Sequence, residues 1–472
     1  MILTNLTATY TDLYQITMGQ VYFLKGAAND RVVFDYFFRK IPFKGGYAIY
    51  AGLQDVLEIL QNLSFSADDL EYLKSQGFNK DYVDSLKDFK FRGCIYSAPE
   101  GDLIFPTRPI LRVEATMLEA QLIETVLLNI INFQSLIATK AARVKQVAKD
   151  KILSDFGLRR SHALGGLSAS RATIIGGFNS TSNVLAGKDY DIPIAGTMAH
   201  SFIQSYDDEL AAFRDFAEGR PDDCILLVDT YDTLKSGVPN AITVGKEMEA
   251  KGKKLVAIRL DSGDLAYLAK KARKMLDDAG LPYVKIAASN QLDEYVIKSL
   301  MDQQAPIDIY GVGTNLVTGQ PDAAFDGVYK LCLSNDQPRI KLSENLSKTT
   351  LPDRKQVWRL YDQDGFLFGA DAISLYDETD IDVMHHAYEP HKQLDIRNIT
   401  KKPLLKKVFD NGEILTGSPS LSDISKYSQE QLSLLPDEYK RFEYPHNYKI
   451  GISSKLRALR NDLREKYKVK KG

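Results

Sequence analysis

The sequence predicts an α/β protein, in which an irregular TIM-like α/β barrel is joined to a mixed α+β region built from the N-terminal and C-terminal segments. Two observations favour this fold. Between residues 152 and 313, short apolar runs alternate with helical segments, which is typical of a parallel α/β architecture. Nearly every run ends in a polar or glycine-containing cluster, and ligands of such folds bind at the carboxyl ends of the strands.

Residues 1–115 are expected to form an N-terminal α+β region. Its predicted elements are a helix capped by Thr11 and Asp12 that runs towards Leu24, a strand over 31–38, a turn over 44–46, a helix over 52–63 and short strands within 94–115.

Residues 116–335 are expected to carry the barrel and the active site, after a long helix over 117–149. The predicted strands lie at 152–156, 192–196, 224–230, 254–261, 283–289 and 307–313, with a weaker candidate at 174–182 and with helices such as 201–217 and 264–279 between them.

Residues 336–472 are expected to form a hairpin-rich region, with Asp364-Gly365 and Asn411-Gly412 as turns. The chain then closes with an amphipathic helix whose basic face, from Lys455 to Lys471, is expected to be solvated.

Composition excludes several classes of protein. A length of 472 residues suits two or three domains, and 44% hydrophobic with 26% charged residues is typical of a globular protein. The net charge of -2 gives no general basic field for nucleic acid. We therefore expect small-molecule partners rather than nucleic acid.

Cysteine usage and hydropathy indicate a cytoplasmic protein. Cys94, Cys224 and Cys332 are far apart and form no CxxC pair, which argues against a zinc ribbon or a disulfide framework. The most apolar segment, 125–139, is shorter than the ~20 residues of a membrane span and contains three amide side chains. We interpret it as a buried helix and expect no membrane partner.

The motif RLDSGD (259–264) places a cation, carboxylates and a glycine turn at one strand end. Arg259 can clamp a carboxylate or phosphate, whereas Asp261 and Asp264 can accept ribose hydroxyl bonds or hold Mg²⁺ on a polyphosphate. A helix cap with a surface ion pair would explain the same residues without a ligand.

Two glycine- or amide-bearing loops follow consecutive strands. GVGTN (311–315) and SNQLD (289–293) can present backbone N–H groups to a phosphate, although such turns are common in α/β proteins.

Two further strand ends carry ring and cationic side chains. DFGLRR (155–160) supplies Phe156 and paired arginines, and GTMAHS (196–201) places His200 before a helix. A histidine there can be a general base, a phosphate ligand, a phosphoryl acceptor or a structural residue.

Taken in order, the motifs resemble the nicotinate phosphoribosyltransferase family, in its long form, within the type II phosphoribosyltransferases. The resemblance runs through TDLYQ (11–15), FFRKIPFKGGYAIYAGL (37–53), PEGDLIFPTRPILRVEA (99–115), DFGLRR, STSN, GTMAHSF, VDTYDT, RLDSGD, SNQLDE and GVGTN. One departure is Pro352-Asp353-Arg354-Lys355, where relatives tend to carry Pro-Gly before a lysine.

The resemblance implies ATP-dependent transfer of the phosphoribosyl group of phosphoribosyl pyrophosphate to nicotinate, giving nicotinate mononucleotide and pyrophosphate, in NAD biosynthesis. It implies ATP as co-substrate and Mg²⁺ as cofactor, carried with the substrate near Asp261 and Asp264 rather than in a dedicated protein site. It also implies a homodimer with shared sites, because Tyr14 would reach the partner's site.

The resemblance also assigns roles to individual residues. The catalytic residues would be His200, as a phosphohistidine, and Asp261. The nicotinate-binding residues would be Tyr14, Phe156, Thr197, Arg259 and Thr314, and the phosphoribosyl pyrophosphate-binding residues Arg159, Ser262, Gly263, Asn290 and Gly313.

Three alternatives are weighed against this assignment. Nicotinamide-using enzymes of this fold carry an acidic residue after the threonine of the GT motif, where this chain has Met198. A quinolinate-using enzyme needs further basic residues and normally has a much shorter chain. Intact Arg259, Asp261 and His200 argue against a non-catalytic sugar-phosphate sensor.

Overall fold

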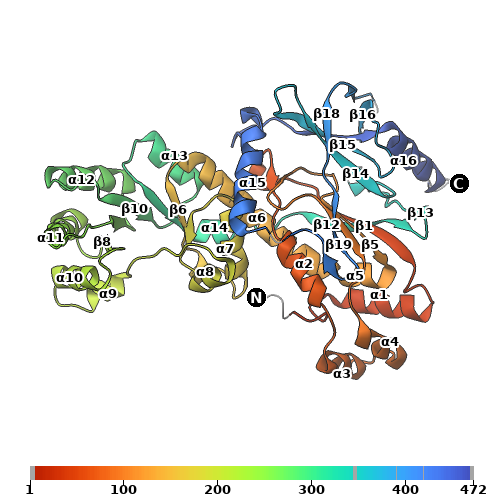
Figure 1. Ribbon diagram of the computed structural model, residues 1–472, viewed down its shortest axis with the longest axis horizontal. Coiled ribbons are helices and arrows are strands. Elements are labelled where there is room, and N and C mark those ends of the chain that lie inside the picture. The colour runs from red at the N-terminus through yellow and green to blue at the C-terminus, as the bar shows by residue number, and fades with distance from the viewer. Residues whose placement is uncertain (1–5, 344–347, 388, 390, 418, 468–472) are drawn as a thin grey trace. The chain divides into compact units, whose positions relative to one another are not determined.

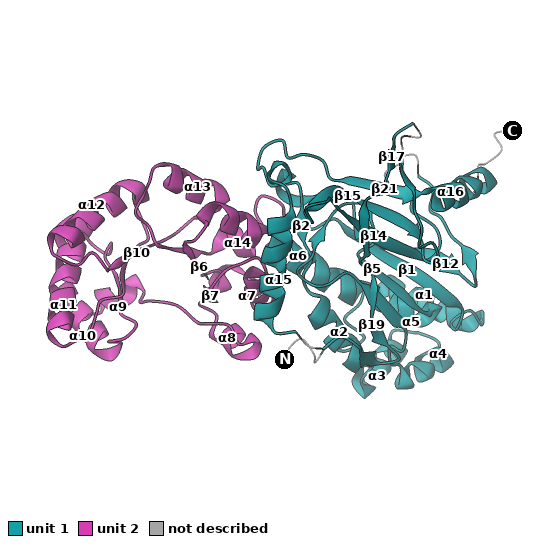
Figure 2. Cartoon of the chain, turned by 45° about the horizontal axis from the view of Figure 1, so that its top comes forward, with its two compact units in different colours: residues 1–139, 324–472 teal, residues 140–323 magenta. Residues whose placement is uncertain are grey.

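A computed structural model describes residues 6–343, 348–387, 389, 391–417 and 419–467 (Figure 1). The chain forms two compact units: unit 1 comprises residues 1–139 and 324–472, and unit 2 comprises residues 140–323 (Figure 2). Unit 2 contains a parallel sheet, and unit 1 contains mainly antiparallel sheets, so the mixed α/β class is confirmed. The predicted division at 115 and 335 stays a prediction.

The sheet of unit 2 has six strands in the order β7-β6-β11-β10-β9-β8, and every pairing is parallel. The strands are β6 (Ile152–Asp155), β7 (Ser180–Thr181), β8 (Ile225–Leu227), β9 (Ala257–Leu260), β10 (Lys285–Ser289) and β11 (Ile309–Val312). The first strand, β6, pairs with the last, β11, which is the connectivity of a barrel. Among the described residues no ladder joins β7 to β8, so a closed barrel stays a prediction.

Helices follow the strands of unit 2, as the alternation of the sequence predicts. They are α7 (Gly165–Ile175), α8 (Val184–Tyr190), α9 (His200–Gln204), α10 (Glu209–Gly219), α11 (Val238–Ala250), α12 (Leu265–Asp278), α13 (Glu294–Asp302) and α14 (Thr314–Val317), with a 3₁₀ turn η4 (Leu158–Arg160) and a π turn η5 (Thr233–Gly237). Asp208, Asp264 and Asp293 cap α10, α12 and α13 with their side chains.

Three sequence expectations for unit 2 were wrong in detail. The run 192–196 contributes only a bridge between Ile194 and Thr181, and Pro193 within it lacks a backbone N–H for a ladder. The expected helix 201–217 is two helices, since Asp208 starts a second one. Most of 174–182 is the end of α7 and its following turn, where Gly177 has φ 101°.

Unit 1 interleaves the N-terminal and C-terminal segments. Its seven-stranded antiparallel sheet runs β13-β12-β1-β5-β3-β19-β20, so β12 pairs with β1 and β19 pairs with β3. Its strands are β1 (Arg31–Phe38), β3 (Cys94–Ser97), β5 (Leu111–Thr116), β12 (Gly327–Ser334), β13 (Gln337–Pro338), β19 (Lys406–Asp410) and β20 (Glu413–Ile414), and β2 (Ala48–Ile49) pairs with β4 (Leu103–Ile104) apart from it. The hairpin turn at Asn411-Gly412 is confirmed, and both residues have positive φ.

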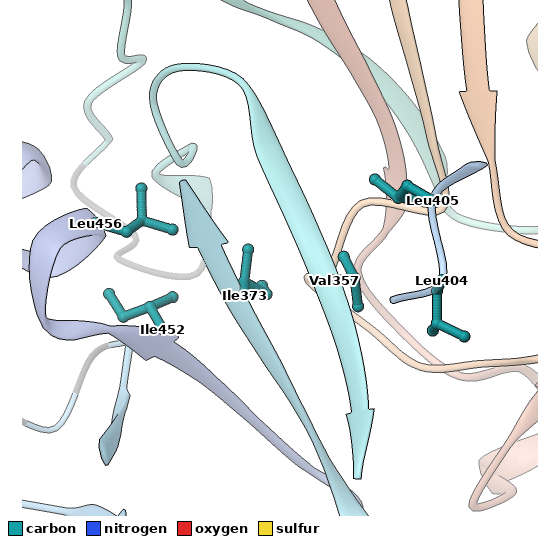
Figure 3. Close-up of a cluster of buried hydrophobic side chains, with 6 residues drawn as sticks. All are labelled: Val357, Ile373, Leu404, Leu405, Ile452 and Leu456. Atoms are coloured by element: carbon teal, nitrogen blue, oxygen red, sulfur yellow. The ribbon is translucent and has the colours of Figure 1, made fainter. Parts of the chain in front are cut away.

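A second six-stranded sheet of unit 1 runs β17-β16-β21-β15-β14-β18, and only β15 and β21 pair in parallel. Its strands are β14 (Lys355–Tyr361), β15 (Leu367–Leu375), β16 (Val383–His386), β17 (Gln393–Asp395), β18 (Thr400–Pro403) and β21 (Lys449–Ser453). Figure 3 shows the buried apolar cluster that joins this sheet to the last helix; it consists of Val357, Ile373, Leu404, Leu405, Ile452 and Leu456. Burial of such side chains stabilises the sheet by roughly 1.5–3 kcal/mol each.

The helices of unit 1 are α1 (Leu13–Leu24), α2 (Leu53–Asn62), α3 (Ala67–Ser75), α4 (Lys80–Ser85), α5 (Met117–Leu122), α15 (Leu421–Leu434) and α16 (Ser454–Tyr467), with 3₁₀ turns η2 (Pro42–Lys44), η3 (Leu86–Asp88) and η7 (Asp437–Tyr439); α6 (Glu124–Ala148) continues from unit 1 into unit 2. Asp12 occupies the N-cap position of α1, as predicted, but its side chain accepts from Thr125 rather than from the backbone of the helix. None of the described helices has the length and apolar character that a membrane span requires.

Candidate active site

Arg259 lies in β9, and a hydroxyl and a carbonyl of the GT motif hold its guanidinium. Its Nη1 donates to Thr197 Oγ1 at 2.6 Å and to Met198 O at 3.2 Å. Burial lowers the pKa of Arg259, while Asp261 and Asp229 oppose this shift. Its buried Nε has no hydrogen-bond partner among the described residues, so this N–H remains available to an acceptor.

The turn after β9 is fixed by a carboxylate from the neighbouring strand. Asp229 Oδ2 accepts from the Asp261 backbone N at 2.7 Å and from Ser262 Oγ at 2.8 Å. Ser289 Oγ donates a very short hydrogen bond to Asp261 Oδ1. Gly263, with φ 76°, then allows the chain to reverse before α12.

His200 begins α9 and faces the same carboxylates. Its Nδ1 lies 3.1 Å from Thr230 Oγ1, and its Nε2 lies 3.8 Å from Asp261 Oδ2 and 4.0 Å from Asp229 Oδ1. The side chain is 38% exposed, whereas that of Asp229 is 1% exposed. The imidazole is therefore oriented by the chain and still reachable from solvent.

The position of Phe156 depends on the glycines of the neighbouring strand end. A Cβ on Gly311 would lie 2.4 Å from two carbon atoms of the Phe156 ring, and one on Gly313 would lie 3.0 Å from the Phe156 carbonyl oxygen. Only glycine lets the ring lie against β11 in this way. The glycines of the GVG sequence thus make room for the Phe156 ring as well as forming a loop.

The loop after β10 contains two consecutive non-glycine residues in the left-handed region. Asn290 and Gln291 both have positive φ, at 78° and 49°. Asn315 Nδ2 donates to Gln291 O and to Leu292 O at 3.3 Å, which ties this loop to the one after β11. Consecutive residues of this kind can turn their N–H groups towards an anion.

One open pocket of unit 2, with an empty volume of about 1790 Å³, gathers most of the predicted site residues. Phe156, Arg159, Thr197, Arg259, Asp261, Asn290, Gly313 and Thr314 line it. His200, Ser262 and Gly263 do not line it. His200 Nε2 lies 3.8 Å from Asp261 of the pocket, Ser262 donates to Asp229, and Gly263 follows Ser262 in the same turn. Tyr14 lies in unit 1, on α1, and its role in the site stays a prediction.

Sequence analysis missed three side chains that organise the site. Asp229 and Thr230 belong to the VDTYDT cluster after β8, where the polar strand end was the available signal. Asp155, at the end of β6, accepts from the Gly157 N–H and from the hydroxyls of Ser170 and Thr181. Asp155 is buried, which raises its pKa, and its bond to the Gly157 N–H supports the turn that follows Phe156.

The described residues contain no group of three or more His, Cys, Asp or Glu side chains arranged for a metal ion. Asp264 is occupied as the cap of α12, accepting from Tyr267 N at 3.0 Å. A cation carried by a ligand would instead find Asp261, together with Asp229 Oδ1, a buried oxygen that has no hydrogen-bond partner among the described residues. Oxygen ligands of this kind suit Mg²⁺.

Two family models match the chain. The nicotinate phosphoribosyltransferase N-terminal domain matches residues 9–132, and the C-terminal domain of the same family matches residues 354–460. A nicotinate phosphoribosyltransferase of Bacillus subtilis (strain 168) is 46% identical, over 94% of this chain and 92% of that protein. The chain belongs to the nicotinate phosphoribosyltransferase family.

Further members and solved structures agree with this family. A nicotinate phosphoribosyltransferase of Caenorhabditis elegans is 36% identical, over 94% of this chain and 91% of that protein. The crystal structure of human nicotinic acid phosphoribosyltransferase superposes with a TM-score of 0.85 at 31% identity, covering 96% of this chain and 99% of the human one. A nicotinate-nucleotide pyrophosphorylase from Pyrococcus furiosus gives a TM-score of 0.71 at 25% identity, covering 90% and 95%.

Proposed function

We propose that this chain transfers the 5-phosphoribosyl group of phosphoribosyl pyrophosphate to nicotinate, releasing pyrophosphate and forming nicotinate mononucleotide for NAD biosynthesis, in the cytoplasm. The names of its relatives support the reaction. The observation that carries the substrate assignment is Arg259, a largely buried guanidinium whose Nε has no hydrogen-bond partner among the described residues. A carboxylate can satisfy this group through charge-assisted bonds, and an amide cannot do so fully.

The reaction needs the pyridine nitrogen held in line with C1 of the ribose. Arg259 and Thr197 would bind the nicotinate carboxylate, and the Phe156 ring would stack on the pyridine. Since Gly311 lets that ring approach β11 closely, the stack would be fixed before substrate binds. Positioning of this kind lowers the barrier because the reacting atoms need no further ordering.

Phosphoribosyl pyrophosphate would extend from Asp261 and Arg159 to the loop of Asn290. The positive φ of Asn290 and Gln291 supports the 5′-phosphate assignment to this loop and to Gly313. Mg²⁺ carried with the substrate would be held by Asp261 and the open oxygen of Asp229, and when bound it neutralises charge on the departing pyrophosphate.

The finer proposal is that ATP phosphorylates His200. With Thr230 accepting the Nδ1–H, Nε2 keeps its lone pair and can attack the γ-phosphorus of ATP, so that an N–P bond forms and ADP leaves. Water then cleaves the N–P bond and releases phosphate. Coupling this hydrolysis to transfer would draw a reversible reaction forward, by about tenfold in equilibrium for each 1.4 kcal/mol.

We also propose a homodimer with shared sites, in which Tyr14 of one subunit contributes to the nicotinate site of its partner. An exposed apolar stripe supports this proposal; it consists of Tyr10, just before α1, and of Leu13, Tyr14, Met18, Val21 and Leu24 on α1. Exposed apolar stripes are typical of interfaces. Mixing Tyr14→Ala and Asp261→Ala subunits should restore activity in mixed dimers, because one of their two sites is intact; no recovery in confirmed mixed dimers would contradict shared sites.

The substrate assignment is tested with nicotinate and nicotinamide in parallel. Arg259→Gln should lower kcat/KM for nicotinate by roughly 10- to 100-fold, the loss expected for a charge-assisted bond, and should change the nicotinamide value much less. Arg214→Gln is the matched control, since Arg214 pairs with Glu247 at 2.7 Å on exposed helices of the same unit. Comparable wild-type kcat/KM for the two substrates would overturn the proposal.

A further inference from the structure

A second polar pocket lies in unit 1, along α16. Its empty volume is about 660 Å³, and its lining consists of His386, Ala387, Arg457, Arg460, Asn461, Arg464 and Glu465. Three arginines and one glutamate give the lining an excess of positive charge. None of these residues belongs to unit 2, which holds the candidate active site.

The arginines are carried by a firmly packed helix. Leu456 and Leu463 of α16 are buried, and Leu456 belongs to the apolar cluster of Figure 3. The arginines recur at intervals of three and four residues, so they lie on one face. The predicted solvated basic face holds for Lys455 and Lys466, which are exposed, but not for Arg460, which is buried; the part of the basic run beyond residue 467 lies outside the described residues.

Neutral acceptors orient two of the guanidinium groups. Arg457 Nη1 donates to His385 Nδ1 at 2.9 Å, so the proton of His385 lies on Nε2 and points to Ser454 Oγ at 3.0 Å. Arg460 donates a very short bond to the Ala387 carbonyl and a bond of 3.2 Å to Asn461 Oδ1. These bonds fix the direction of both guanidinium groups at the lining of the pocket.

His385, which lies on β16 beside the pocket, is buried. It is 8% exposed, and burial together with Arg457 lowers its pKa. A buried, neutral imidazole is what allows a cation to approach it. The end of β16 is thus built to hold Arg457 in place.

We propose that this pocket is a binding site for a phosphate-bearing anion with a diphosphate or triphosphate chain, separate from the active site. Planar guanidinium groups bind phosphate oxygens in pairs, and three of them on one helix face match a chain of phosphates better than a single small anion. The anion would link α16 to the end of β16. Free pyrophosphate and the chain of a nucleoside triphosphate share this chemistry.

The test uses the full-length protein and three probes at constant ionic strength: inorganic pyrophosphate, inorganic tripolyphosphate and ATP. Binding is measured by calorimetry and located by hydrogen exchange of α16 and β16. Pyrophosphate or tripolyphosphate should slow exchange in both elements, and Arg464→Gln should weaken this binding about tenfold, the loss of one charge-assisted bond. Lys466→Gln removes one charge from the same helix outside the pocket and should leave binding unchanged.

Several outcomes decide the proposal. If Arg464→Gln and Lys466→Gln weaken anion binding equally, binding reflects only the general positive charge of the helix, and the proposal is overturned. Unchanged hydrogen exchange of α16 at saturating pyrophosphate and tripolyphosphate would also overturn it. Arg464→Glu should abolish the protection, and its persistence would also overturn the site. Because ATP is also proposed to bind near His200, the comparison uses protection of α16: protection at lower concentrations of ATP than of tripolyphosphate would assign the site to a nucleotide, whereas protection at equal concentrations would assign it to the inorganic chain.

Discussion

Two clusters of arginine and aspartate lie in different environments, one in each unit of this protein. In unit 1, Arg108 and Arg359 lie with Asp102 and Asp371, and all four side chains are 0% exposed. In unit 2, the corresponding group is Arg259 with Asp229 and Asp261, beside His200, and it borders an open pocket.

The closed cluster of unit 1 links the N-terminal segment of that unit to its C-terminal segment. Arg359 Nη1 binds Asp102 at 2.7 Å, and Arg108 Nε lies 2.9 Å from Asp371, so each charge has an opposite charge within reach. The open cluster of unit 2 keeps Arg259 Nε and Asp229 Oδ1 without hydrogen-bond partners among the described residues. The same residue types thus serve architecture where the cluster is fully buried with its charges paired, and binding where it borders an open pocket.

The largest effect is expected from substitution of His200, which lies beside the open cluster. His200→Asn should abolish nicotinate-dependent ATP hydrolysis and the acid-labile phosphate on the protein, because the amide nitrogen of asparagine is not nucleophilic and cannot accept the phosphoryl group. A slow transfer without ATP should survive, since displacement needs only positioned substrates. The measurement is labelling from γ-labelled ATP beside product formation, with His391→Asn as the control.

Two other outcomes are informative for His200. Parallel loss of transfer and ATP use, with no phosphoprotein in the wild type, would favour a general base. Full ATP-coupled turnover in His200→Asn would return this histidine to a structural role.

The next effect tests the closed cluster. Arg359→Leu leaves Asp102 and Asp371 buried with one arginine, and should lower the free energy of unfolding by about 3–5 kcal/mol. Arg397→Leu, which breaks the exposed pair with Asp395, should cost less than about 1 kcal/mol. Denaturant unfolding measures both. If both substitutions lowered the free energy of unfolding by the same amount, the buried cluster would contribute no more to stability than the exposed pair.

A smaller effect is expected at the wall of the open pocket. Gly311→Ala would place a methyl group against the Phe156 ring, which must then move; KM for nicotinate should rise by roughly tenfold or more, because a small misplacement weakens a preformed stack. Gly219→Ala, which meets no atom within 4 Å, is the control. An unchanged KM would show that Phe156 does not position the substrate.

Local patterns predicted much of the fold and most of the pocket. The strands at β6, β8, β9, β10 and β11 and the helices α2, α6 and α12 lie where periodicity and caps placed them. The short β7 and the bridge at Ile194 were overestimated, because an apolar run does not report whether a neighbouring strand offers ladder bonds. Asp229 escaped notice for a related reason, since its importance comes from contacts with a turn 32 residues away.

By itself, the sequence determined the α/β class, the family resemblance and eight of the residues that line the pocket, because strand ends and motifs are local properties of the chain. Only the tertiary structure decided that β6 and β11 are neighbours, that Asp229 holds the RLDSGD turn, and that Arg108 and Arg359 share one buried cluster. It also decided that His385 is buried and that arginines of α16 form a pocket. These facts rest on contacts between residues distant in sequence, whose pairing and desolvation are set by packing and leave no periodic signal.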